Sequence, residues 1–557
     1  MRLPQIWKRA FLAITLPLAF AACDDDPVAP AELVPPAGLT VTANGATAAT
    51  ITFSSVQGAT EYVLQRAAGT AGNFAEIATL SATTYEDSGL EAGTAYRYRV
   101  AAVRSGQQSS FSSAVSLTTA VEGPMEATIS SNITSNRTLY ADTLYTLSGY
   151  VRVGNGATLT IEPGTKIVGD YDVIASSLFI ERGARIMAEG TAAEPIVFTS
   201  SRPEGERRPG DWGGLVLLGN GVINRSSPVI LEGTENLDSP VEYSGGSDNS
   251  DSSGSLKYVR IEFAGHEVAP NAELNSLTLA AVGSGTVIEH VQVLAGLDDS
   301  FEWFGGAVDA RYLVSYEAGD DHLDISEGYQ GRIQHAIAFQ SRQLLPRPGA
   351  GSVASDPQGI ENDGCSGQNC LDGQDSEPLN LPVIANFTLI GAGSAYTTSG
   401  GDMGMNIRRG TGGYYVNGVV ARYDRAAISL RDATTQARLA DDDLLVSNLV
   451  LAENGQAFLP QTGETVQFSV DEEDNDIDLV AGSAASLFNA LPTDPSSATQ
   501  FDWTPAAGSP AATGGLTEFN GKLAERAGSF VTATSYRGAA DPNGDKWWEG
   551  WTTYADN

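Results

Sequence analysis

The chain has 557 residues, and its 32 Lys or Arg residues against 68 Asp or Glu residues give a formal net charge of −36. This length is enough for several domains, and so acidic a surface repels phosphate backbones, which argues against nucleic acid as a partner. The 61 glycines and 18% of charged residues are typical of turn-rich β-structure rather than of disorder.

The N-terminus has the pattern of an export signal. Basic residues within residues 1–9 precede an apolar run from Phe11 to Phe20, which is too short to span a bilayer and is typical of a signal-peptide core. The following sequence FAAC, residues 20–23, resembles the bacterial lipobox, with Phe20 in place of the usual Leu. The resemblance implies a signal peptide at residues 1–22 and a lipidated Cys23, and an ordinary secretory signal is the alternative.

An acidic tether rich in Pro and Ala follows at residues 23–34. Its Asp24, Asp25 and Asp26 resemble surface-export signals of some Gram-negative lipoproteins, whereas in enteric bacteria Asp at this place suggests retention in the inner membrane. We expect a lipid-anchored protein of the bacterial outer membrane or cell surface.

Residues 35–120 resemble a fibronectin type III domain. The segments PPAGLTVTA, ATITFSSV and GATEYVLQRA match its first three strands, with Phe53 where Trp is usual. Leu90 and Tyr96 bracket Gly93 and Thr94 in the pattern of the family's tyrosine corner. The resemblance implies a β-sandwich that acts as a spacer or a weak binding platform.

The rest of the chain repeats short apolar segments at a nearly constant interval. DDSFEWFGG begins at residue 298 and DDHLDISEG at residue 320, and HVQV at residue 290, YLVS at residue 312 and HAIA at residue 335 keep nearly the same spacing. Looser copies begin at Asn386, Asn417 and Asn448. Such a repeat of alternating strands closed by Gly turns predicts a stacked β-solenoid.

An earlier pair of similar segments, LTIEPGTKI at residues 159–167 and LFIERGARI at residues 178–186, predicts one shorter turn that stacks Leu178 on Leu159. No segment after the signal region predicts an amphipathic helix. Excess residues between repeats predict loop insertions at residues 233–255, 341–380 and 461–485.

The long motifs of residues 124–557, such as LYTLSGYVRVGNGATLTIEPGTKIVG and GDWGGLVLLGNGVIN, resemble a family of exported proteins with a right-handed parallel β-helix. Many members are bacterial surface lipoproteins without assigned chemistry. We therefore predict an all-β protein: a fibronectin type III β-sandwich at 35–120 and a right-handed parallel β-helix at 124–557. In this arrangement Trp547, Trp548 and Trp551 would cap the open end of the coil.

The repeat stacks carboxylates on carboxylates. Adjacent turns of a parallel coil lie about 4.8 Å apart, and the apolar partners Phe301/Leu323 and Trp303/Ile325 point inward by alternation, so Glu302 and Asp324 should point outward. The candidate metal ligands are six carboxylates on two neighbouring turns: Asp298, Asp299, Glu302, Asp320, Asp321 and Asp324.

Several explanations of this acidic stack are open. Crowded carboxylates protonate or hold a cation, and oxygen ligands suit Ca²⁺. Counting one more turn from Asp320 reaches Arg342, which would supply the counter-charge instead. The aspartates also could cap turns by accepting backbone N–H bonds. For catalysis, Asp320 and Asp321 in GDDHLDI resemble the paired aspartates of polygalacturonases, but that family's other motifs are missing; Asp320, Asp321 and Arg342 are the catalytic candidates.

Cys365 and Cys370 are the remaining cysteines and lie in a short Gly-rich segment. Export permits a disulfide, and no second Cys or His pair completes a metal site with them. We expect a disulfide between them.

These features favour a cell-envelope lipoprotein with a non-enzymatic role in binding, adhesion or surface structure. Its partner would be a polysaccharide or an outer-membrane protein, and its only expected cofactor is Ca²⁺. The alternative is a polysaccharide lyase or glycoside hydrolase that uses the same acidic face.

The lipid anchor is testable through Cys23. No other segment is long and apolar enough to hold a membrane, so Cys23→Ser should abolish palmitate labelling and move the protein to the soluble fraction. A Cys23→Ser protein that stays in the membrane fraction with unchanged labelling would rule out the lipoprotein interpretation.

Overall fold

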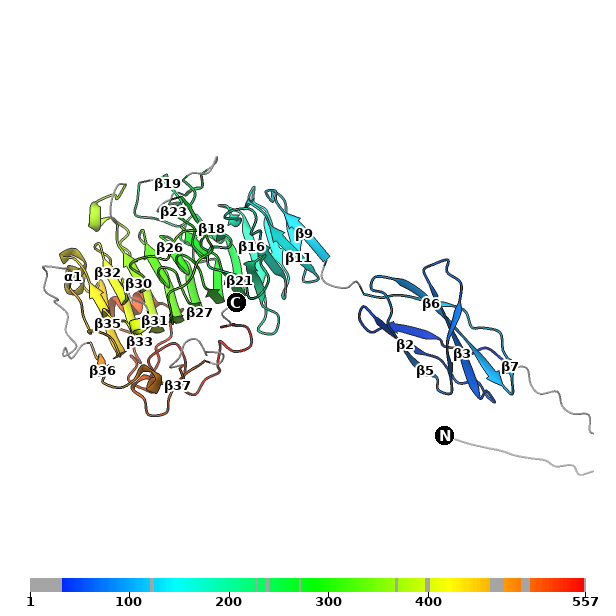
Figure 1. The fold of residues 1–557 in the computed structure, drawn as a ribbon. Coiled ribbons are helices and arrows are strands. Elements are labelled where there is room, and N and C mark those ends of the chain that lie inside the picture. The colour runs from blue at the N-terminus through cyan, green and yellow to red at the C-terminus, as the bar shows by residue number, and fades with distance from the viewer. Residues whose placement is uncertain are drawn as a thin grey trace, which may run out of the picture. The chain divides into compact units, whose positions relative to one another are not determined.

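The computed structural model describes residues 33–120, 125–226, 228–235, 240–243, 245–269, 272–365, 369–395, 401–460, 475–491 and 501–554 (Figure 1). Its contacts divide the chain into two compact units, Met1–Pro124 and Met125–Asn557. The predicted signal peptide at 1–22 and its Cys23 lie outside the described residues. Among the described residues, no helix is long and apolar enough to cross a membrane.

The first unit is a β-sandwich of two antiparallel sheets. Phe53 and Tyr98 lie in its buried core, and the Tyr96 hydroxyl accepts a hydrogen bond from the Glu91 N–H at 2.9 Å, which confirms the tyrosine corner. One sheet contains β1 (Thr40–Ala43), β2 (Ala48–Thr52) and β5 (Thr84–Ser88), and the other contains β3 (Glu61–Ala68), β4 (Ala75–Leu80), β6 (Ala95–Arg104), β7 (Gln107–Gln108) and β8 (Val115–Thr118).

The second unit is a parallel β-helix, in which successive turns of the chain stack their strands on one another (Figure 1). One face is a nine-stranded sheet whose strands follow chain order. Its members are β12 (Tyr150–Val153), β15 (Ser177–Ile180), β18 (Gly214–Leu218), β24 (Leu277–Ala280), β26 (Phe301–Phe304), β28 (Leu323–Ser326), β30 (Gln358–Asp363), β32 (Met403–Arg408) and β34 (Ala426–Leu430).

The remaining strands of the coil form one 15-stranded sheet. Its early strands are short. From β21 on, one long strand takes the place of two short ones: the first half of β21 pairs with β16 and its second half with β17. The long strands therefore span two faces of the coil. The members are β9 (Met125–Ile129), β10 (Arg137–Leu139), β11 (Thr143–Leu147), β13 (Thr158–Ile161), β14 (Lys166–Gly169), β16 (Arg185–Glu189), β17 (Ile196–Ser200), β21 (Gly254–Glu262), β25 (Val287–Leu294), β27 (Asp309–Tyr316), β29 (Arg332–Phe339), β31 (Val383–Ile390), β33 (Gly413–Ala421), β35 (Leu444–Ala452) and β36 (Asp478–Val480).

The long strands share one bend. Each bends at a single residue with positive φ, between 49° and 61°, and the pairing register puts these residues in one column. The left-handed conformation turns the backbone without breaking the strand. The column consists of Tyr258, His290, Tyr312, His335, Asn386, Asn417 and Asn448.

The register predicted for the two acidic repeats is confirmed. Phe301 pairs with Leu323 and Trp303 with Ile325, and all four side chains lie in the buried interior of the coil. Alternation along the strand therefore sends Glu302 outward, as predicted.

The register predicted for the earlier pair of segments is wrong. Leu159 pairs with Ile186 rather than with Leu178, and Leu178 pairs with Val151. One turn here contains two similar strand–turn–strand segments, and these lie on different faces.

The C-terminal segment covers the outside of the 15-stranded sheet. Trp548 and Trp551 are buried with Val314 and Ile337 on that surface, and the Gln292 side chain donates to the Thr553 carbonyl at 2.6 Å. The prediction that Trp547, Trp548 and Trp551 cap the end of the coil is therefore wrong. The apolar outer side chains of the middle strands need cover, and the returning chain provides it.

Two short α-helices are present in the described residues, although no segment after the signal region predicted an amphipathic helix. Leu523 and Ala527 of α2 (Gly521–Ala527) pack against Val383 and Tyr414 on the outer side of the coil. Helices of one or two turns are too short to display helical periodicity. The remaining small elements are α1 (Ala433–Ala440), η1 (Gly373–Asp375), η2 (Gly393–Ala395), η3 (Ala484–Leu487), η5 (Pro510–Ala512) and the hairpin strands β19 (Val229–Ile230), β20 (Glu242–Tyr243), β22 (Glu267–Ala269), β23 (Ala272–Glu273), β37 (Phe488–Ala490) and β38 (Asp502–Pro505).

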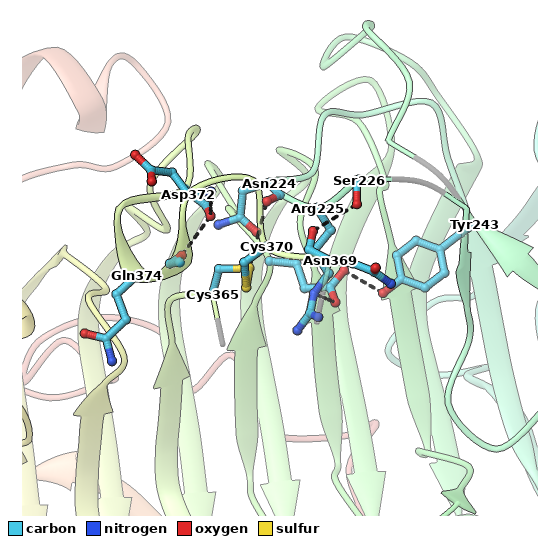
Figure 2. Close-up of a disulfide and its surroundings, with 12 residues drawn as sticks. Asn224, Arg225, Ser226, Tyr243, Cys365, Asn369, Cys370, Asp372 and Gln374 are labelled. Carbon is cyan, nitrogen blue, oxygen red and sulfur yellow. Dashed lines mark hydrogen bonds and ion pairs between the residues drawn. A yellow bond between two sulfur atoms is a disulfide. The ribbon is translucent and has the colours of Figure 1, made fainter. Parts of the chain in front are cut away.

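Cys365 and Cys370 form a disulfide in the structure (Figure 2). The bonded segment lies against residues 224–226: Cys370 makes an isolated bridge with Arg225, and the Ser226 N–H donates to the Asn369 carbonyl at 2.8 Å. The disulfide closes a short loop within the insertion after β30, and these backbone contacts join that loop to the insertion after β18.

The covering role of the C-terminal segment predicts a large effect of Trp551→Ala. The side chain is 1% exposed, and removing a buried Trp costs about 3–5 kcal/mol, so the variant should unfold at lower temperature and lose protease resistance within residues 539–554. Tyr140→Ala is the matched control, because Tyr140 is 52% exposed. Equal thermal stability of the two variants would contradict this packing.

Candidate functional site

The predicted acidic residues meet on the outer side of the nine-stranded sheet. Glu302 on β26 pairs with Asp324 on β28, which pairs with Glu361 on β30. Their apolar neighbours fill the interior of the coil. Glu302 nevertheless is only 2% exposed, because an insertion covers this part of the sheet.

A ladder of hydrogen bonds connects the turns that precede these strands. Asn275 accepts from the Asp299 N–H at 3.1 Å, Asp299 accepts from the Asp321 N–H at 2.8 Å, and Asp321 accepts from the Gln358 N–H at 2.5 Å. The alternative that aspartates accept backbone bonds is therefore correct for Asp299 and Asp321. Each uses one carboxylate oxygen, Oδ1, in this way.

All six predicted carboxylates enter one cluster, together with Glu361. Oxygen atoms within three groups of three residues lie within 4.8 Å of one another. Asp298, Asp320 and Asp324 are half-buried and the others are buried. The three groups are Asp298–Asp299–Asp320, Asp299–Glu302–Asp324 and Asp321–Asp324–Glu361.

Burial and mutual repulsion raise the pKa of every carboxyl group in this acidic cluster. For Asp298 and Asp321, burial is the largest cause and the neighbouring Asp320 carboxylate is the next. The pKa of Glu361 rises to about 8, first by burial and then by Asp363 and Asp324. Burial, followed by Glu273, raises the pKa of the nearby Glu232 to about 7. The same pattern holds for Asp299, Glu302, Asp320 and Asp324.

The predicted position of Arg342 is wrong. After β28 the coil returns to this face only at Glu361, which pairs with Asp324, so Arg342 falls in the intervening insertion. There it lowers the pKa of Glu317 against the larger effect of burial, which raises that pKa to about 7. Arg342 lies within the insertion predicted at residues 341–380, so counting a fixed period across it could not give the next partner of Asp324.

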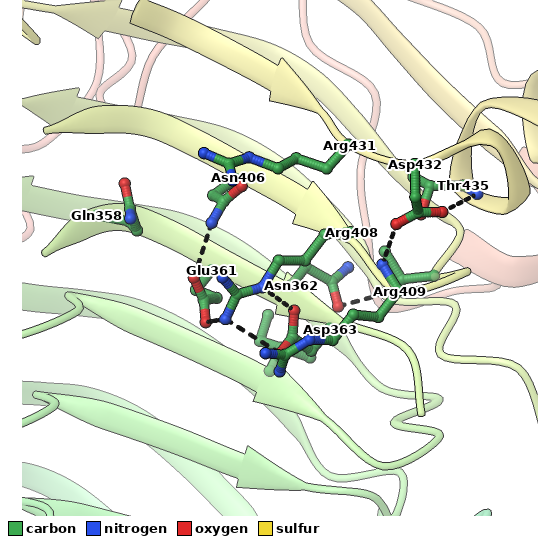
Figure 3. A network of polar contacts seen from close by, with 12 residues as sticks. Gln358, Glu361, Asn362, Asp363, Asn406, Arg408, Arg409, Arg431, Asp432 and Thr435 are labelled. Atoms are coloured by element: carbon green, nitrogen blue, oxygen red, sulfur yellow. Dashed lines mark hydrogen bonds and ion pairs between the residues drawn. The ribbon is translucent and has the colours of Figure 1, made fainter. Parts of the chain in front are cut away.

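Arginines instead meet the acidic cluster at its far end (Figure 3). Arg408 on β32 contacts Glu361 and lies 2.6 Å from an Asp363 oxygen, and Arg409 also pairs with Asp363. Burial alone would lower the pKa of Arg408, but Asp363 and Glu361 raise it on balance. Arg408 therefore stays charged and neutralises this end.

Sequence reasoning missed Glu361, Asp363, Glu232 and Asn275 as members of this site. One signal was present: Ile360-Glu361-Asn362 resembles Leu323-Asp324-Ile325 in carrying an acidic residue after an aliphatic one. Glu232 had no such signal, because it comes from an insertion rather than from the repeat.

The insertion after β18 carries Arg225 and Tyr243, which lie near the disulfide (Figure 2). The Tyr243 hydroxyl donates to Glu327 at 2.5 Å, and Arg225 pairs with the same carboxylate at 2.5 Å. Tyr243 also packs with Phe304 of β26. Since the disulfide segment contacts Arg225, the two insertions support each other at this edge.

The residues of the acidic cluster fit a Ca²⁺ ion. All donors are carboxylate oxygens, and Ca²⁺ takes about 6–8 oxygens at about 2.3–2.6 Å, which places opposite ligands about 5 Å apart, as in the 4.8 Å groups. Among the described residues, the buried Asp324 Oδ1 has no hydrogen-bond partner. The ligands would come from Asp298, Asp299, Asp320 and Asp324, and the ion would supply the missing positive charge.

Comparison with known proteins places the coil in a described family. The sequence model of "Pectate-lyase like beta helix domain" matches residues 131–493. The N-terminal unit is similar to solved structures: a Fn3-like protein from Clostridium thermocellum (30% identity, 15% of this chain, 92% of that chain, TM-score 0.15) and the domain of human fibronectin type III domain containing protein 3 (24% identity, 17% of this chain, 94% of that chain, TM-score 0.16). The observed architecture and the family match confirm the predicted fold class.

One curated relative is the poly(3-hydroxybutyrate) depolymerase of Ralstonia pickettii. It is 33% identical over 146 residues, which is 22% of this chain. The chain spans only 29% of that relative's length.

The raised pKa values predict that the stability of the fold decreases as pH rises when divalent ions are removed. A carboxyl group whose folded pKa is raised stabilises the fold fully below its unfolded value near 4, and this stabilisation is lost as pH rises through the folded value, which is about 8 for Glu361. In EDTA the melting temperature should therefore drop between pH 5 and 8. Replacing Asp320 and Asp321 together by Asn should flatten the drop; an equally steep drop would contradict the assignment.

Proposed function

Because the chain belongs to the family of pectate-lyase-like β-helix domains, we propose that its nine-stranded face binds Ca²⁺ and, through it, an acidic polysaccharide. The observation that carries the proposal is the acidic cluster: three groups of carboxylates with oxygens within 4.8 Å on consecutive turns. Like charges this close repel strongly unless protons or a cation intervene. A cation with open coordination positions in turn attracts carboxylate ligands.

The arginines beyond the acidic cluster support an anionic ligand. Arg431 lies one turn beyond Arg408, and its own contacts are weak: Ser429 Oγ at 3.3 Å and Met403 Sδ at 4.0 Å (Figure 3). From the turn of Asp324 to that of Arg431 is three steps, about 14 Å at about 4.8 Å per turn. An acidic chain running along the coil could contact the ion at one end and Arg431 at the other.

An enzymatic role is the second candidate, and the family match favours it. A lyase needs a basic group beside the ion. Arg431 is the best candidate, because burial, followed by Arg425 and Arg408, lowers its pKa. Binding without cleavage is preferred, because a guanidinium is a poor base. The neighbouring Arg408 is in addition held in its charged form by two carboxylates.

The proposal includes an envelope location. A lipid on Cys23 would anchor the protein to the bacterial outer membrane or cell surface, with the N-terminal sandwich as a spacer. The β-helix face would then meet polysaccharide, or an outer-membrane protein, outside the cytoplasm.

Calcium binding predicts a gain in thermal stability. If Ca²⁺ binds only the folded protein, a concentration about 100 times Kd stabilises it by about 2.7 kcal/mol. Addition of CaCl₂ after EDTA should raise the melting temperature, and Asp320→Asn with Asp321→Asn should abolish the rise. The control pair Glu126→Gln with Asp172→Asn, both exposed and distant in sequence, should keep it.

Assays with polygalacturonate separate binding from cleavage. Polygalacturonate should bind the wild-type protein only with Ca²⁺, and Arg431→Ala should weaken binding about tenfold. New reducing ends or unsaturated products would favour the enzyme. Absence of both the calcium shift and polygalacturonate binding would exclude both candidates.

A further inference from the structure

A second site lies on a different face, where the column of bend residues changes in character. Asn386, Asn417 and Asn448 occupy the later turns, and Asn tolerates positive φ well. The four earlier turns carry Tyr258, His290, Tyr312 and His335 at φ between 49° and 61°. Of these, the bulky Tyr258 and Tyr312 carry backbone strain in this conformation, and such strain is concentrated at functional positions.

Both parts of the column contact the C-terminal segment: His335 Nδ1 lies 3.0 Å from the Ala539 carbonyl oxygen, and the Tyr312 ring packs against Trp547. Asn386 and Asn417 bind it directly: the Asn386 amide donates to Thr534 Oγ1 at 2.8 Å, and Asn417 Oδ1 accepts from the Leu516 N–H at 2.6 Å. Opposite the aromatic part, the segment leaves a cleft of about 620 Å³. This volume is typical of a small-ligand site.

The cleft has one aromatic side and one acidic side. The rings of Tyr258, His290, Tyr312 and His335 stack with centroids 4.3, 4.5 and 5.0 Å apart. The C-terminal segment contributes the half-buried Trp547 and the exposed Asp541, Asp545 and Glu549. Within the described chain, the hydroxyls of Tyr258 and Tyr312 make no hydrogen bond, and neither does the buried His290 Nδ1, which lies 3.5 Å from Glu289 Oε1.

We propose that this aromatic cleft binds a neutral glycan segment. Rings with polar edges pack against sugar carbons and bond their hydroxyls, and carboxylates accept hydrogen bonds from hydroxyls. The stacked rings cover each other's faces, which disfavours a cation–π mode for an ammonium ligand. The site is independent of the proposed calcium site, which lies on the nine-stranded sheet.

The two proposed sites differ in the charge of the ligand that they favour. Contact with the His290 imidazole, together with Arg311, lowers the pKa of Glu289 to about 2, so that carboxylate is ionised. The cleft's cation Lys546 is already paired, with Asp502 at 3.0 Å and Glu549 at 3.2 Å. Acidic polysaccharides are therefore repelled from this cleft.

The test is calorimetric titration of the full chain with three hexasaccharide sets: neutral glucose, mannose and galactose oligomers, an oligogalacturonate and a chitosan oligomer. A neutral oligomer should bind in EDTA. Trp547→Ala should weaken this binding at least tenfold, and so should Tyr258→Phe with Tyr312→Phe, which keeps the ring stack. Tyr140→Ala and the Asp320→Asn, Asp321→Asn pair should leave it unchanged.

The following results would overturn the inference. Binding of the chitosan oligomer alone would make the cleft an ammonium site, and neutral binding that survives both cleft variants would place the glycan elsewhere. Failure of every neutral oligomer to bind folded wild-type protein would also overturn it. Loss of calcium or polygalacturonate binding affects only the function proposed for the nine-stranded sheet.

Discussion

The structure depends on one constraint, the stacking of equivalent residues about 4.8 Å apart along a parallel coil. Inside the coil this places Phe301 over Leu323 and Trp303 over Ile325, where close packing of like side chains is favourable. On the outside the same constraint places Asp324 between Glu302 and Glu361. There repetition is unfavourable: burial first, and then repulsion between neighbouring carboxylates, raises the pKa values of Glu302 and Asp324.

The two outer columns show how neighbours change the use of a repeat. The acidic column is largely buried and lies beside an insertion that contacts the disulfide segment. The bend column contacts the returning C-terminal segment through hydrogen bonds at its asparagines and through ring packing beside a cleft at its aromatic residues. The two proposals therefore assign different ligands to the two surfaces of one coil: an anion bound through a cation on one, and neutral hydroxyls on the other.

Sequence reasoning succeeded where the repeat is uninterrupted. Between residues 298 and 328 the period is constant, so register, inward residues and the acidic cluster could be predicted. It failed at the insertion that follows residue 328. A fixed period pointed to Arg342 as the next partner of Asp324, whereas the actual partner is Glu361. It also failed near residue 159, where two similar segments in one turn belong to different faces.

The fold class, the tyrosine corner of the first unit and the identity of the six clustered carboxylates could be predicted from the sequence, because each depends on local alternation or a short fixed spacing. The surroundings of these residues depend on tertiary contacts. Glu232 and Arg408 reach the acidic cluster from distant segments, and the C-terminal tryptophans pack on the flank of the coil rather than at its end. Contacts between segments far apart in the chain follow from the burial of whole surfaces, which no local pattern encodes.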